Sequence, residues 1–177
     1  MARDNRDYAI DLLDRTSKEL GIDFGVDCVD FNLLPYSAAY YFSDEFGSTI
    51  YVPKTYNGTL FDLKQLIFHE CGHSWLRKKG GRVSKYLEKA FGLSEDDDGA
   101  LKYFFKTIRF YFKERESGYC SGYSMLNAEE DFCETFSFVL CNRKRKGPWK
   151  FDGEVIDYLN DEILFNKVSA IKRLLKI

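Results

Sequence analysis

Residues 60–77 read LFDLKQLIFHECGHSWLR, and this stretch predicts the buried helix around which the rest of the chain is arranged. Apolar side chains surround most of its circumference, which is typical of a helix inside a protein core. Thr59 and Asp62 have the spacing of a capping box at the helix start. Gly80-Gly81 is expected to end the helix, because glycine adopts the left-handed conformation that terminates helices.

The segment His69-Glu70-Cys71-Gly72-His73 gives this helix its chemistry. His69 and His73 project from one helical face, about 40° apart, so their imidazoles can share one zinc ion. Glu70 follows the first histidine and can take a proton from a water on the metal. The chain has only 2 histidines and both lie here, which argues against a chance match. The sequence therefore predicts one Zn²⁺ per chain.

A second helix, predicted over residues 123–140, supplies the third zinc ligand. Asn127 or Ser124 can cap its start. On a helical wheel Glu130 and Glu134 fall within about 40° of each other, beside an apolar face. Carboxylates in such a place favour a cation as partner. We expect Glu130 to bind zinc and Glu134 to accept a hydrogen bond from the far ring nitrogen of a ligand histidine.

Glu129 is the competing candidate for the third ligand. On the same wheel it lies among apolar residues, about 100° from Glu130 and on the side away from Glu134. Asp131 lies about 100° from Glu130 in the other direction and is expected to face solvent. The wheel therefore favours Glu130 over both neighbours.

Together the two motifs resemble those of the gluzincin metallopeptidases, in which a glutamate on a downstream helix is the third zinc ligand. The nearest subgroup is the catalytic domain of anthrax lethal factor and the small minigluzincins. Their Glu-x-Phe-x-Glu-x-Phe helix is matched by Glu130, Phe132, Glu134 and Phe136, and their upstream tyrosine by Tyr123. Over residues 35–170 the resemblance implies a zincin-like domain that cleaves peptides or proteins. It also implies that Tyr123 can donate to the oxyanion of the reaction.

Composition sets the remaining bounds on the protein. The chain has 177 residues, of which 45% are hydrophobic, so we expect it to form one domain over residues 1–177 and to be a monomer. The net charge of −2 gives no argument for a nucleic-acid partner. The sequence has no apolar run of about 18 residues, so no membrane span is expected, and no signal peptide is evident.

The 5 cysteines are an odd number without framework spacing, which favours reduced thiols and a cytoplasmic location. We expect none of the four cysteines nearest the two motifs to bind the zinc, although Cys133 and Cys141 lie beside the helical face that carries Glu130 and Glu134. These four are Cys71, Cys120, Cys133 and Cys141.

The other segments predict an α+β fold, in which a small twisted sheet packs on the two helices predicted over residues 60–77 and 123–140. Helices are predicted over residues 4–20, 83–91 and 100–116, and one helix or a pair of helices over 155–175. Strands are predicted within 23–34, 36–42 and 48–52. The last two strands should form a hairpin. The acidic run 94–98 and the basic run 143–146 are expected to be solvated charge near helix ends.

Two alternatives to a peptidase stay open at this point. One is a zincin-like regulatory or binding protein whose metal site is catalytically silent, or occluded by the C-terminal segment. The other is an interaction module without zinc. Glu70 argues against the silent site, because a purely structural zinc site needs no base.

Overall fold

The computed structural model describes residues 5–32, 39–45, 47–78, 90–91 and 116–177. Its helices are α1 (Asn5–Leu20), α2 (Leu60–Lys78), the 3₁₀ turn η1 (Tyr123–Met125), α5 (Ala128–Asn142) and α6 (Glu162–Leu175). Its strands are β1 (Cys28–Asn32), β2 (Tyr40–Asp44), β3 (Gly47–Pro53), β4 (Trp149–Phe151) and β5 (Glu154–Ile156). Helices and small sheets occur together, so the predicted α+β class is confirmed.

The larger sheet has three strands in the order β1-β3-β2. β1 runs parallel to β3, whereas β2 is antiparallel to β3 with Tyr41 opposite Ile50. The predicted hairpin is therefore confirmed, although β2 continues to Asp44, and residues 36–38 lie outside the described part of the chain. The buried side chains Ile50 and Val52 alternate with less buried ones along β3, as a sheet covered on one face requires.

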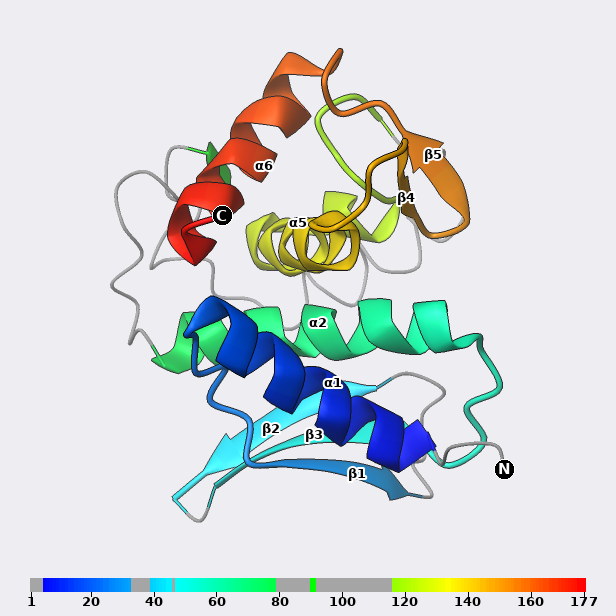
Figure 1. Ribbon diagram of the computed structural model, residues 1–177, viewed down its shortest axis with the longest axis vertical. Coiled ribbons are helices and arrows are strands. Elements are labelled where there is room, and N and C mark those ends of the chain that lie inside the picture. The colour runs from blue at the N-terminus through cyan, green and yellow to red at the C-terminus, as the bar shows by residue number, and fades with distance from the viewer. Residues whose placement is uncertain (1–4, 33–38, 46, 79–89, 92–115) are drawn as a thin grey trace.

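Helix α2 lies in the middle of the molecule (Figure 1). The three-stranded sheet and α1 lie on one side of α2, α5 lies on the other, and α6 with the β4–β5 hairpin lies beyond α5. Aromatic rings fill the space between α2 and α5, where Phe132 stacks on Trp75 at 5.7 Å between ring centroids. Phe68, Phe132 and Phe136 are fully buried there. Each such side chain contributes roughly 1.5–3 kcal/mol by leaving water, so this contact fixes α5 against α2.

The starts of both central helices are capped as predicted. The Thr59 amide donates to Asp62 Oδ2 at 2.8 Å, and the Asp62 amide donates to Thr59 Oγ1 at 3.2 Å, which completes the capping box. At α5 the Glu130 amide donates to Asn127 Oδ1 at 2.8 Å. These bonds satisfy helix N–H groups that have no partner inside the helix, and the second one sets where Glu130 falls on α5.

The prediction of a helix or a pair of helices over residues 155–175 is wrong for the first part of that range. Residues 154–156 form strand β5, which pairs with β4, and α6 begins only at Glu162 after its cap Asp161. The turn between the strands is Asp152-Gly153, with φ of 46° and 78°. Two successive positive φ values are characteristic of the type I′ turn, which joins antiparallel strands tightly. The Asp-Gly pair was the local signal for this hairpin.

Several predicted features lie outside the described residues. These are residues 100–115 of the helix predicted at 100–116, most of the helix at 83–91, the acidic run 94–98 and Gly80-Gly81. In the basic run, Arg143 and Lys144 both form ion pairs with Glu19, at 3.2 and 2.5 Å. Within the described ranges, no helix combines the length and the apolar character needed to cross a bilayer.

Candidate metal centre

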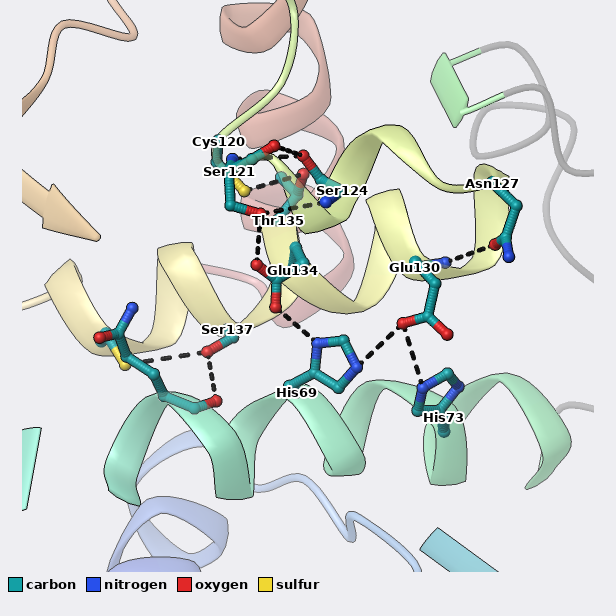
Figure 2. A network of polar contacts seen from close by, with 12 residues as sticks. His69, His73, Cys120, Ser121, Ser124, Asn127, Glu130, Glu134, Thr135 and Ser137 are labelled. Carbon is teal, nitrogen blue, oxygen red and sulfur yellow. Dashed lines mark hydrogen bonds and ion pairs between the residues drawn. The ribbon is translucent and has the colours of Figure 1, made fainter. Parts of the chain in front are cut away.

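The predicted residues His69 and His73 on α2 meet Glu130 and Glu134 on α5 where the two helices face each other (Figure 2). From α2, Nε2 of His69 lies 3.0 Å and Nε2 of His73 lies 3.6 Å from the same oxygen, Oε2 of Glu130 on α5. His69 and Glu130 are buried, with 8% and 5% of their surface exposed. The structure thus brings the two imidazoles of α2 together with a carboxylate that lies more than fifty residues later in the chain.

A second carboxylate on α5 orients the first histidine. Glu134 Oε1 lies 2.7 Å from Nδ1 of His69, so Nε2 is the nitrogen left to face Glu130. Ser121 Oγ in turn donates to the other Glu134 oxygen at 2.5 Å and accepts from the Ser124 amide at 3.0 Å. This chain of contacts, drawn in Figure 2, joins the loop before α5 to the histidine. The place expected for Glu134 agrees with the structure, whereas Ser121 was not singled out from the sequence.

The other histidine is oriented by Glu129, and here the sequence-based expectation was wrong. Glu129 does not lie among apolar residues: its side chain is 51% exposed, and Oε1 lies 2.7 Å from Nδ1 of His73. Both histidines therefore have their Nδ1 atoms next to carboxylates and their Nε2 atoms directed at Glu130. A bond to Nδ1 fixes ring orientation and tautomer, which is how ligand histidines are commonly held.

Asp131 also departs from its expected position toward solvent. It is 4% exposed, and its Oδ2 forms an ion pair at 2.6 Å with Lys167 of α6, which is itself buried. Lys167 also donates to the Gly118 carbonyl at 2.6 Å. A helical wheel gives angles between side chains but not the neighbours that cover each face. α6 covers the face that carries Asp131.

Glu70 and Tyr123, the two predicted catalytic residues, lie at the same centre. Glu70 is 6% exposed, and the backbone of Tyr41 on β2 acts to lower the pKa of its carboxyl group. Burial raises the pKa of Glu70 and outweighs the opposing effect of His69 and His73. The ring of Tyr123 lies 5.6 Å from that of His69, between centroids, and 39% of the residue is exposed.

Electrostatics couples the histidines to the carboxylates. Burial acts to lower the pKa of His69, but the contacts with Glu130 and Glu134 outweigh it and hold the pKa above its ordinary value. Burial acts to raise the pKa of Glu130, but the contacts with His69 and His73 hold it below its ordinary value. The carboxylates thus favour positive charge at this point, whether it comes from protons on imidazole or from a metal cation.

A thiol accompanies the two histidines. Sγ of Cys133 and one ring nitrogen each of His69 and His73 all lie within 4.8 Å of one another, so this largely buried group can hold a metal ion. Cys133 follows Glu130 by three positions on α5, which places both side chains toward the same part of α2. Glu130 and Cys133 are therefore both candidates for the third metal ligand beside His69 and His73. Oε2 of Glu130 lies 3.0 and 3.6 Å from the two Nε2 atoms, and Sγ of Cys133 lies within 4.8 Å of a ring nitrogen of each histidine.

The spacing of the donors agrees with the size of a zinc ion. Zinc lies about 2.0–2.1 Å from nitrogen and oxygen ligands, so tetrahedral geometry keeps two ligands about 3.3 Å apart. The separations of 3.0 and 3.6 Å lie on either side of that value. His69, His73 and Glu130 would therefore hold such an ion with little movement.

Comparisons of the chain with protein-family models, with curated proteins and with solved structures found no match.

Proposed function

We propose that this protein is a zinc-dependent endopeptidase with a zincin-like domain. The observation that carries the proposal is the convergence of Nε2 of His69 and Nε2 of His73 on Glu130 Oε2, at 3.0 and 3.6 Å. In this proposal His69, His73 and Glu130 bind one Zn²⁺ and Glu70 is left as the base. When bound, zinc polarises the substrate carbonyl and makes water more acidic.

Glu70 transfers the proton in the proposed reaction. It accepts a proton from the attacking water and delivers it to the leaving amine. A carboxylate can serve in both steps, because it takes up the proton and then releases it. Tyr123, beside His69 and partly exposed, donates its phenol O–H to the oxyanion that develops on the substrate.

Strand β2 offers a way to bind the peptide substrate. It is at one end of the β1-β3-β2 order, and in the described part of the chain it pairs only with β3. An extended peptide can add to such an edge through backbone hydrogen bonds. Tyr41, whose backbone influences the pKa of Glu70, belongs to this strand. A peptide paired with β2 would therefore lie close to the proposed base.

The test combines metal analysis with peptide cleavage. Purified protein should contain one zinc per chain and cleave members of a random peptide library, and a chelator should abolish cleavage. Glu70→Gln should retain zinc and lose about 10²–10⁴-fold in rate, because the amide cannot accept the proton. Tyr123→Phe should lose less, about 10²–10³-fold at most, since zinc still polarises the carbonyl. Undiminished cleavage by Glu70→Gln would exclude this mechanism.

The second candidate is a catalytically silent metal-binding protein. Cys133 is the observation that favours it, because a thiolate together with His69, His73 and Glu130 would give the metal four protein donors. Zinc sites with four protein ligands are structural, whereas catalytic sites keep one position open. Zinc at one per chain with no cleavage of any library peptide, by wild type or by variants of Cys133, would favour this candidate.

A further inference from the structure

Among the described residues at the metal centre, Cys133 is a group to which neither the proposed reaction nor the orientation of the histidines gives a role. It is fully buried, and its Sγ lies within 4.8 Å of a ring nitrogen of each histidine. Two independent features point to a cation here: this thiol group, and the convergence of two Nε2 atoms on Glu130 Oε2. α5 therefore presents an oxygen donor and a sulfur donor to the same pair of imidazoles.

Gly72 lets the thiol come this close. A Cβ atom on Gly72 would lie 2.9 Å from the Cys133 Sγ and 2.9 Å from its Cα, so any side chain would push that part of α5 away. Gly72 directly precedes His73 on α2. The absence of a side chain at this position brings the sulfur to the surface of α2 next to the ligand histidine.

The distances allow sulfur to join the donor set. With Zn–N near 2.1 Å and Zn–S near 2.3 Å, tetrahedral geometry keeps nitrogen and sulfur about 3.6 Å apart. Because 4.8 Å is the largest separation in the thiol–histidine group, the side chains need to close by at most about 1 Å. Thiolate is a soft ligand with high affinity for zinc, so its coordination is chemically favourable.

We propose that Cys133 is a fourth protein donor that closes the metal centre in its resting state. The inference rests on the proposed function, because it concerns the same centre and describes how access to it is regulated. When sulfur binds the metal, the thiol releases its proton to solvent. When sulfur leaves, it takes a proton back, and the fourth position is open to solvent and substrate. No oxidant or reductant takes part.

The test uses cobalt(II) in place of zinc and reads absorbance rather than activity alone. Metal-free protein loaded with cobalt should show the visible bands of a tetrahedral site and, in addition, a near-ultraviolet thiolate-to-cobalt band. Cys133→Ser should lose the near-ultraviolet band and keep the visible ones. Cys71→Ala is the matched control, since Cys71 is also fully buried and lies on α2 in the same motif. Cys71→Ala should keep both the visible bands and the near-ultraviolet band. Circular dichroism establishes that each variant is folded.

The outcomes separate this inference from the proposed function. Visible cobalt bands without a thiolate band in wild type would overturn the role of Cys133 and leave the three-ligand centre standing. Absence of all cobalt bands would contradict the metal centre itself, and with it the proposed function. With zinc bound, Cys133→Ser should cleave library peptides several-fold faster than wild type. A variant that loses the thiolate band yet cleaves no faster would overturn the closed resting state.

Discussion

Gly72 lies against Cys133 so closely that a methyl group on the glycine would meet the cysteine Cα at 2.9 Å. This contact sets how near α2 approaches α5. The approach in turn sets the distance between the two histidines on α2 and the carboxylate of Glu130 on α5. Gly72 therefore helps to set the dimensions of the metal centre, together with the aromatic contact between Trp75 and Phe132.

Gly72→Ala should therefore lower both stability and metal affinity. Inserting a methyl group into such a packed contact costs about 1–3 kcal/mol, and separating the helices moves Glu130 away from the histidines. Urea unfolding and zinc titration would measure the two effects. Gly147→Ala is the control, because no atom of the described residues lies within 4 Å of a Cβ added there. Equal behaviour of the two variants would contradict the spacing role of Gly72.

The two adjacent glutamates of α5 should differ sharply when each is replaced by alanine. Glu130→Ala removes a ligand and should abolish stoichiometric zinc. Glu129→Ala removes only the carboxylate bonded to Nδ1 of His73, so the protein should still bind zinc, about 10–100-fold more weakly. Competition with a chelator of known affinity measures both. Loss of zinc from Glu129→Ala alone would show that α5 is rotated relative to the geometry described above.

Ser121→Ala should weaken metal binding without removing any ligand. The serine hydroxyl donates to Glu134, which holds Nδ1 of His69, so its loss leaves the histidine less well oriented. A decrease in zinc affinity of up to about tenfold is expected, at the low end for residues that support ligands. Ser121→Thr keeps the hydroxyl and should restore the affinity. A threonine variant as weak as the alanine variant would argue for a packing role instead.

The buried ion pair between Asp131 and Lys167 should show strong coupling in a double-mutant cycle. Lys167→Met leaves a buried carboxylate without its partner, which costs about 3–5 kcal/mol. Asp131→Asn combined with Lys167→Met should cost much less than the sum of the single changes, because neither charge remains. The exposed Lys150→Met is the control and should change stability little. Denaturant unfolding provides all the values.

Asp131 should also make stability depend on pH in a particular direction. Burial outweighs the attraction of Lys167 and raises the pKa of Asp131 from 3.8 to about 6. Since the folded protein binds this proton more tightly, the contribution of the group is complete below pH 3.8 and is lost as pH rises through about 6. The unfolding free energy of wild type minus that of Asp131→Asn should thus decrease between pH 4 and 6. An increase over this range would show that the ion pair dominates.

The sequence alone determined the local parts of the centre. Helical periodicity places His69 and His73 on one face of α2, and the same periodicity places Glu130 and Glu134 together on α5. The capping residues Thr59, Asp62 and Asn127 were readable for the same reason, because a cap acts within one turn of its helix. The Asp152-Gly153 turn was equally local, and its hairpin could have been predicted.

Only the tertiary structure decided what faces each side of those helices. Periodicity fixes the angle between Glu129, Glu130 and Asp131 but not which neighbour covers each one. The structure puts His73 against Glu129 and Lys167 against Asp131. It also brought Cys133 to the histidines, because the missing side chain of Gly72 lets two helices far apart in sequence come into contact. Such contacts depend on packing between distant segments, and no local pattern in the chain records that packing.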